Sequence, residues 1–364
     1  VLIGEYRSDA RATFIQADLT SVELGSLVAD LRGRATGTVS LRGAGAELNG
    51  SAQLSLQGVR SVDAPRDVSV DGVLNATLVD DRLRLVAQAR DEGAVEASAD
   101  VTLPVVSSAA PLRLAIDRTR PLSGEVSAQG EIRPIWDLFL GGQRSLSGQV
   151  QARAQLGGSL NELRLNGRMD LSRGAFRDSS SGLRLEDLGL AVRFDDETAL
   201  IETFAASDGD GGTVSGDGRL GLRQGSASSF RLQLANFRVI DNDLANARAS
   251  GPLTVERRTD GNITLAGRLD VDEARIEPNL PGSNGIVQMD VVEVNRPGGV
   301  PDDDEAERAP AGPQIGLAIQ IRSPGGDVRV VGRGLNVELN VNAEVRGTVN
   351  RPILTGVARV VRGD

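Results

Sequence analysis

The chain of 364 residues carries 50 acidic and 40 basic side chains, a formal net charge of −10. This acidic balance disfavours a nucleic-acid partner, because attraction to phosphate requires a basic surface. All of the cations are arginine, and the sequence contains no Lys, His or Cys. These absences exclude an imidazole base, a Ser-His-Asp triad, a cysteine nucleophile, a Schiff-base lysine and a Cys/His zinc site. We therefore expect no enzymatic activity, cofactor or metal.

The apolar inventory indicates a turn-rich protein without a large aromatic core. The sequence has 44 Gly and 14 Pro but only seven Phe, one Trp and one Tyr. Compact cores of this size usually contain more large rings, so we expect a thinner and more extended fold. The lack of Cys is compatible with both the cytosol and the periplasm.

Neither a signal peptide nor a membrane span is visible in the sequence. The chain begins at Val1 without a basic stretch followed by an apolar one, and no run approaches the roughly 18 to 20 apolar residues of a span. We expect a soluble segment of a longer protein whose anchor lies outside the printed residues.

In chain order, the patterns predict two short helices among many strands. Thr20 and Glu23 have capping-box spacing and predict a helix over residues 20–31. Pro134–Leu140, followed by two glycines, predicts the second helix. Elsewhere apolar and polar residues alternate, which is typical of strands with one dry and one wet face. The alternating runs cover residues 68–78, 83–89, 95–103, 163–171, 188–194, 263–271, 315–321 and 335–345.

Turn residues separate these strands at short intervals, as at Asn49-Gly50, Asp80-Asp81 and Pro324-Gly325-Gly326. Short strands with such punctuation predict an antiparallel meander of hairpins. A one-residue change of phase near Asp187 is typical of a bulge or bend. We therefore predict an all-β fold: an elongated, curled antiparallel sheet with one or two short capping helices.

Similar strand sequences recur along the chain. Their glycines, Gly50, Gly167, Gly267 and Gly356, lie 117, 100 and 89 residues apart. This spacing exceeds the roughly 20 to 50 residues of common solenoids, so each unit is expected to contribute several strands. We predict sheet modules over residues 1–145 and 146–295, a disordered acidic loop rich in Pro and Gly over 296–314, and truncated C-terminal strands over 315–364.

A sheet with one apolar face must cover that face with a second layer or with something other than protein. Small aliphatic side chains line a groove without filling it, and hydrocarbon chains are natural occupants because burying each methylene is worth roughly 0.8 kcal/mol. A closed β-sandwich or β-helix with tightly packed small residues remains the alternative. The predicted lining of the groove is Leu163, Leu165, Met169, Leu171, Leu188, Leu190, Val192, Leu220, Leu222, Ile263, Leu265, Leu269, Val271, Ile315, Leu317, Ile319, Ile321, Leu335, Val337, Leu339, Val341, Ala343 and Val345.

Other motifs are better explained as structure than as sites. The G-x-G-x-x-G string at 216–221 continues an alternating run, whereas the dinucleotide fingerprint must lie between a strand and a helix. The string at 208–212 resembles a calcium loop but lacks the later bidentate Glu, so it predicts a hairpin turn. The paired carboxylates at 80–81, 195–196 and 302–305 fall in turns, and Arg362-Gly363-Asp364 is expected by chance. We expect Trp136 and Phe139 to dock the second helix on a sheet rather than to bind a ligand.

Three C-terminal strings, VRVVGRGL at 328–335, VRGTVNRPILTG at 345–356 and RVVRG at 359–363, resemble the C-terminal region of the TamB family. These AsmA-like proteins are inner-membrane-anchored subunits of the translocation and assembly module. Upstream strings at 147–160, 165–167 and 183–188 are similar to the repeated unit of the same family.

The resemblance implies a β-taco with an apolar interior that spans the periplasm and conducts phospholipids between the inner and outer membranes. It also implies a role, with the outer-membrane barrel partner TamA, in assembling autotransporters and other outer-membrane proteins. The family's N-terminal membrane helix is missing from these residues, and so is the final segment that reaches TamA. Acyl chains, TamA through that missing segment, and nascent outer-membrane proteins are thus the implied partners.

Overall fold

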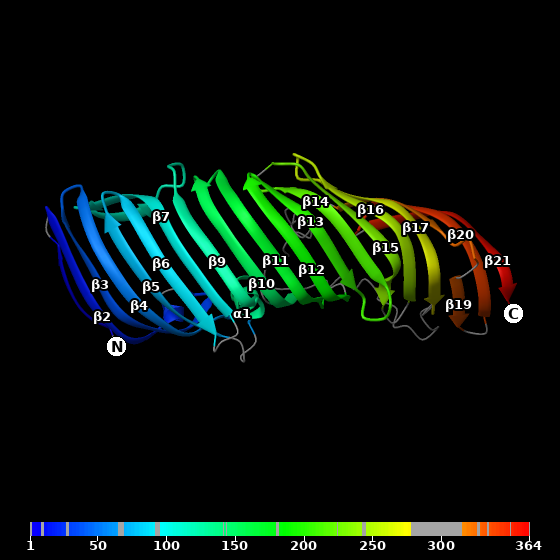
Figure 1. Cartoon of the computed structure of the whole chain (residues 1–364), viewed down its shortest axis with the longest axis horizontal. Coiled ribbons are helices and arrows are strands. Elements are labelled where there is room, and N and C mark those ends of the chain that lie inside the picture. Colours follow the sequence, from blue (N-terminus) through cyan, green and yellow to red (C-terminus); the bar gives the residue numbers. More distant parts are fainter. Residues whose placement is uncertain are drawn as a thin grey trace, which may run out of the picture. The chain divides into compact units, whose positions relative to one another are not determined.

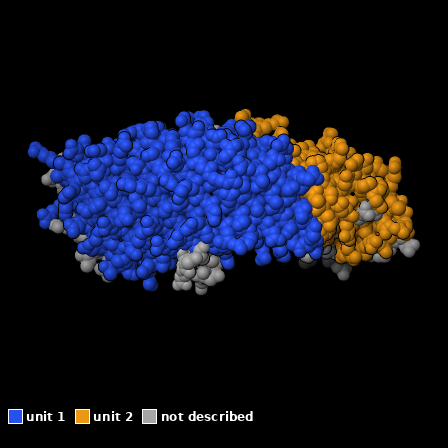
Figure 2. Space-filling view, viewed as in Figure 1, with its two compact units in different colours: residues 1–233 blue, residues 234–364 orange. Residues whose placement is uncertain are grey.

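The computed structural model describes residues 2–8, 11–26, 29–64, 69–91, 95–140, 142, 144–179, 182–223, 225–241, 245–277, 315–325, 328–332, 335–349 and 351–363. The chain forms two compact units, unit 1 over Val1–Gln233 and unit 2 over Leu234–Asp364 (Figure 2). The predicted module boundary at 145/146 falls inside unit 1, within a strand, and the predicted loop over 296–314 lies outside the described residues.

Unit 1 is an antiparallel meander in which sequential strands pair (Figure 1). The exception to this order is β8, which pairs with the last part of β7, so that β9 takes the next place beside β7 in the main sheet. The strands of unit 1 are β1 (Leu2–Ser8), β2 (Ala12–Glu23), β3 (Leu31–Ala44), β4 (Glu47–Ser61), β5 (Val70–Val79), β6 (Arg82–Asp91), β7 (Val95–Ala109), β8 (Leu112–Ile116), β9 (Ser123–Glu131), β10 (Arg144–Gly158), β11 (Leu163–Asp178), β12 (Leu183–Asp196), β13 (Thr198–Ser207) and β14 (Thr213–Gly221). Strand β15 (Ser228–Asp241) contains the division between the units.

Unit 2 departs from the antiparallel prediction at one place. Its strands are β16 (Ala245–Arg257), β17 (Ile263–Ile276), β18 (Ile315–Arg322), β19 (Val328–Gly332), β20 (Leu335–Thr348) and β21 (Arg351–Gly363). Strand β17 runs parallel to both β18 and β19, whereas β20 is antiparallel to β18, β19 and β21. The sheet is therefore mixed, because alternation fixes the faces of a strand but not its direction relative to a neighbour.

The all-β prediction is confirmed, and one of the two predicted helices is present. Helix α1 (Arg133–Leu140) occupies the predicted position. The helix predicted over 20–31 is wrong: β2 continues to Glu23, and only a 3-10 turn, η1 (Leu24–Ser26), follows it in the described residues. Val22 and Glu23 pair with Ala35 and Arg34 of β3, so sheet pairing overrides the capping-box pattern.

Bulges recur near one end of the strands of unit 1. Ser21, Gly58, Arg173 and Asp187 have positive φ angles and lie at shifts of register, and the one at Asp187 confirms the predicted phase change. The Ser21 and Gly58 amides donate to side chains of the next strand, at 3.2 and 2.7 Å respectively. Because a bulge bends its strand and increases the local twist, this series of bulges helps to curl the sheet, whose strands bow in Figure 1.

Two small apolar clusters pack on the inside of the curl, at opposite ends of β3 and β4. At one end, Leu24, Ala35 and Val59 are buried, and Leu138 of α1 packs against them. At the other end, Leu48 and Leu78 are buried with Val105 and Ala109 from the last part of β7. The apolar side of the sheet is therefore covered at these two places by α1 and by β7.

Candidate functional site

The register of unit 1 aligns apolar residues in rows that cross the sheet. Directly paired residues share a face, so a row can be followed from strand to strand through the pairings. The longest row crosses twelve strands from β2 to β14 and consists of Leu19, Gly37, Leu54, Leu74, Ala87, Ala99, Val126, Ala154, Gly167, Phe194, Ala199 and Leu220. None of its members is charged, and we call the face that contains it the trough face.

The trough face is long compared with a lipid tail. Neighbouring strands lie roughly 4.8 Å apart, so twelve strands span about 50 Å along the row. One leaflet of a bilayer has a hydrocarbon thickness of about 15 Å, half of the usual core. The row therefore has room for several acyl chains end to end.

Partial burial distinguishes this face from a packed core. In the long row, Leu54, Leu74, Ala87, Ala99 and Val126 are all only half-buried. Full burial occurs at the two clusters, where Leu78 is 2% and Ala35 is 1% exposed beneath β7 and near α1, and further along the row at Ala154 and Ala199, which are 8% and 3% exposed. From β4 to β9 the long row therefore has neighbours within the sheet but no interlocking second layer among the described residues, which favours an open groove over a closed sandwich.

The registers place the predicted lining residues of β11 and β12, and Leu220 of β14, on this face, while Leu222 follows the end of β14. Met169 pairs with Val192 and Leu171 pairs with Leu190, while Leu220 pairs with Ala199 of the long row. Leu171, Leu188 and Val192 are buried, Leu220 and Leu222 are 39% and 38% exposed, and the others are half-buried. The half-buried residues are Leu163, Leu165, Met169 and Leu190.

Unit 2 has an apolar face of the same kind. One row joins Leu253, Gly267, Ile319, Val345 and Leu354 across five strands. Among the predicted residues of this unit, Leu269 and Ala343 are buried, Ile315 is 38% exposed, and the side chain of Leu335 lies outside the described part. The remaining predicted residues are half-buried, namely Ile263, Leu265, Val271, Leu317, Ile319, Ile321, Val337, Leu339, Val341 and Val345.

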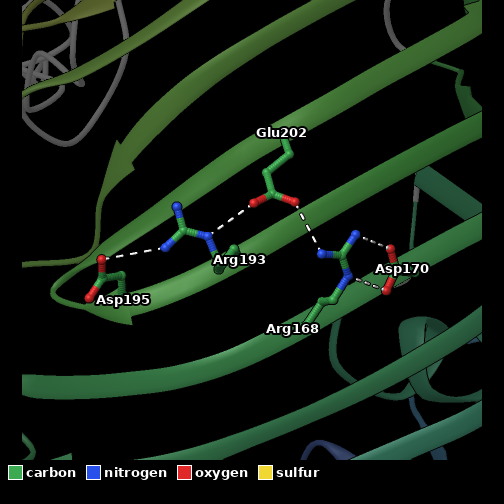
Figure 3. Close-up of polar contacts among 5 residues, drawn as sticks. All are labelled: Arg168, Asp170, Arg193, Asp195 and Glu202. Carbon is green, nitrogen blue, oxygen red and sulfur yellow. Dashed lines mark hydrogen bonds and ion pairs between the residues drawn. The ribbon is translucent and has the colours of Figure 1, made fainter.

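The opposite face carries the charges, as Figure 3 shows for β11, β12 and β13. Arg168 and Arg193 are paired across β11 and β12, and Glu202 lies between their guanidinium groups at 3.1 and 3.0 Å. Asp170 and Asp195 complete the chain, at 2.8 Å from Arg168 and 3.5 Å from Arg193. These exposed ion pairs add little stability, but they identify this face as the solvated one.

A hollow of about 620 Å³ opens over β6, β7, β9, β10 and β11, and most of the residues that line it are polar. Its arginines already have partners: Arg90 lies 3.9 Å from Glu96, and Arg153 lies 3.3 Å from Glu125. Without an uncompensated charge or an apolar lining, this hollow is a weaker candidate than the trough face.

The G-x-G-x-x-G string has a packing role that sequence reasoning missed. Phe204 of β13 and Phe230 of β15 meet edge to face with ring centroids 5.5 Å apart. Phe204 is paired with Gly216, and a Cβ on Gly218 would lie 2.5 Å from the Phe230 ring. The absent side chains of β14 thus leave space in which the two rings meet, and the string lies within a strand rather than before a helix.

The remaining motifs serve the fold. The Asp208 carboxylate accepts hydrogen bonds from the amides of Asp210 and Gly212 at 2.8 and 2.9 Å, as a hairpin turn requires. Asp80 and Asp81 form the predicted tight turn, both with positive φ. Trp136 packs edge to face on Phe176, with centroids 6.4 Å apart, which confirms its docking role. The side chain of Phe139, residues 302–305 and Asp364 lie outside the described part.

The described residues contain no group of three or more acidic side chains placed to hold a metal ion. No helix among them has the length and apolarity that a membrane crossing requires.

The family model of the TamB C-terminal domain matches residues 202–364, from β13 to the end of the chain. No curated protein and no solved structure matches the chain.

Proposed function

Residues 202–364 belong to the TamB C-terminal domain family, and from this premise we propose that the protein is a bridge that conducts phospholipids between the inner and outer membranes. It works in the periplasm, held at the inner membrane by a helix outside the printed sequence. The family match supports a part in outer-membrane assembly or lipid transport, and the apolar faces of both units favour the lipid role.

The observation that carries this proposal is the half-burial of long, uncharged apolar rows. An acyl chain placed on such a row covers the exposed part of each side chain and gains roughly 0.8 kcal/mol for each methylene removed from water. The interaction has no preferred direction or register, so a chain slides along the row without breaking a specific bond. Transfer of this kind needs no catalytic residue and no cofactor.

A second candidate function is an interaction scaffold for outer-membrane proteins, working with the barrel TamA. The observation that favours it is β21, which is exposed along its whole length. Ile353, Val357 and Val361 are 61%, 55% and 53% exposed, and Leu354 and Val360 on the alternate positions are 68% and 66% exposed. A strand with apolar residues at both sets of positions, and with no paired strand other than β20 among the described residues, is suited to pairing with an added strand.

The experiment that tests the lipid function compares two substitutions on β20. Val341→Asp puts a charge on the apolar face, where Val341 pairs with Ala358, whereas Asn342→Asp puts the same charge on the opposite, exposed face. We expect Val341→Asp to abolish phospholipid transfer between vesicles and phospholipid retention after detergent-free purification, and Asn342→Asp to preserve both.

Circular dichroism of both variants accompanies the assay. Because Val341 is half-buried, its charged replacement should leave the strand content intact. Unfolding by Val341→Asp would instead indicate a packed core. Normal transfer by a folded Val341→Asp variant, with loss of assembly activity when Val357→Pro disrupts β21, would favour the scaffold.

A further inference from the structure

The last part of β7 leaves the main sheet and forms a two-stranded arm with β8. Residues Val105–Ala109 of β7 pair with Leu112–Ile116, and this pair forms a separate ladder from the main sheet. The arm is joined to the main sheet at Pro104, which is buried and pairs with Arg82 of β6.

Hydrogen bonds hold the arm along the turns at one end of unit 1. The Val105 amide donates to the Asp81 carbonyl at 2.9 Å, and the Ala109 amide donates to the Gly45 carbonyl at 2.9 Å. The Ser107 hydroxyl donates to the Asp81 carboxylate at 2.6 Å. The arm is thereby fixed to the β5–β6 turn and to the β3–β4 turn.

Two contacts show that the arm covers the trough face. Thr13 of β2 is paired with Gly43, which is paired with Leu48, so all three belong to the trough face. The Thr13 hydroxyl donates to the Ala109 carbonyl. Val105 and Ala109 themselves pack on Leu48 and Leu78 of the same face.

The two strands of the arm differ in burial although they share a face. Val105, Ser107 and Ala109 are 0%, 8% and 0% exposed. Their direct partners Ile116, Leu114 and Leu112 are 48%, 46% and 43% exposed. One edge of the last part of β7 is bonded to the turns, and β8 lies along its other edge. The exposed triad of Leu112, Leu114 and Ile116 therefore continues the apolar surface that Val105 and Ala109 begin.

We propose that β8 is a second wall of the trough, and that a phospholipid acyl chain lies between Leu112, Leu114, Ile116 and the sheet floor of β3 to β6. This inference rests on the lipid function proposed above. Its support is the continuity of the triad with the lining of the trough face, and the absence of a polar side chain among the three residues. An acyl chain matches this surface because it needs apolar contact on two sides and no hydrogen-bond partner.

The test is photocrosslinking with benzoylphenylalanine incorporated at single positions of the full chain. Leu114→benzoylphenylalanine probes the inner side of β8, and the same replacement of Arg113 is the control on the other side of that strand. Met169 and Arg168 form the matching pair on β11, where Met169 lies on the trough face and Arg168 on the solvated face. Each variant is mixed with vesicles of phosphatidylethanolamine and phosphatidylglycerol, irradiated and analysed by intact-protein mass spectrometry.

We expect phospholipid adducts at Leu114 and Met169 and their absence at Arg113 and Arg168. Adducts at Met169 without adducts at Leu114 overturn the second wall while leaving the lipid function in place. Absence of adducts at both Leu114 and Met169 overturns both proposals. Equal labelling at Leu114 and Arg113 also overturns the second wall, because it shows contact without a preferred side, and a polypeptide adduct at Leu114 overturns the lipid as the occupant. Leu114, Arg113 and Arg168 are each more than about one third exposed, so their replacement should not disturb folding. Met169 is half-buried.

Discussion

An open trough predicts that two leucines on the same face of one strand differ in their contribution to stability. Leu78 of β5 is 2% exposed beneath the β7 arm, whereas Leu74, on the same face four residues earlier, is half-buried in the long row. Replacing Leu78 by Ala removes apolar contacts and leaves a cavity, so we expect a loss of about 2 to 5 kcal/mol in the free energy of unfolding.

At Leu74 the cavity contribution should be missing. Solvent or lipid already reaches this side chain, so Leu74→Ala loses only the transfer free energy of the methylenes that neighbours cover, about 1 to 2 kcal/mol. Urea unfolding followed by far-ultraviolet circular dichroism measures both variants in the same buffer, and a constant slope against urea checks that the same unfolding reaction is observed. Equal losses for Leu74→Ala and Leu78→Ala would refute the open trough, because they require an interlocking layer above Leu74.

Two further predictions concern packing and pH. Gly218→Ala should cost about 1 to 3 kcal/mol by crowding Phe230, whereas Gly189→Ala, whose Cβ would meet only the Ala205 carbonyl at 4.0 Å, should be tolerated; the urea midpoints decide, and equal midpoints contradict the close approach at Gly218. Hydrogen bonds from Arg329 and Arg362 hold the pKa of Glu338 below its ordinary value, and the hydrogen bond from Arg84 does the same for the pKa of Asp100. A carboxylate with a lowered folded-state pKa stabilises the fold above its unfolded-state pKa and loses that contribution as pH falls through the folded value, so thermal stability should be flat near neutrality and fall below about pH 4. A transition near pH 6 to 7 in the thermal-melting midpoint would contradict this assignment.

The sequence was sufficient for the strands and their faces because the side-chain period of two is local. Val337, Leu339 and Val341 alternate with polar residues, and the registers place them on one face as the alternation predicts. The alternation at 83–89 and 95–103 was equally visible, yet the predicted lining began only at Leu163. The sequence therefore carries the same signal for the N-terminal part of the trough.

Long-range features could not be read in this way. The parallel pairing of β17 with β18 joins residues about fifty positions apart, and nothing in either strand specifies direction. Pro104 marks the start of the arm in the sequence, but the residues from Val105 to Ala109 have no feature that distinguishes them from a strand of the main sheet. At Glu23 a local pattern gave the wrong prediction. The capping-box spacing predicts a helix, but Glu23 pairs with Arg34 of β3 in the sheet.

The two apolar clusters also explain how a sheet with an exposed apolar face avoids closing on itself. The long row includes the small residues Gly37, Ala87 and Gly167, which offer little area to drive two halves of the sheet together. Helix α1 contacts the sheet on both sides of the curl, since Leu138 packs near Val59 of β4 and Trp136 packs on Phe176 of β11. A rigid helix in this position sets the distance between β4 and β11. Coverage by α1 and β7 is thus located at the two clusters, whereas the small residues interspersed along the long row leave space for the proposed occupant.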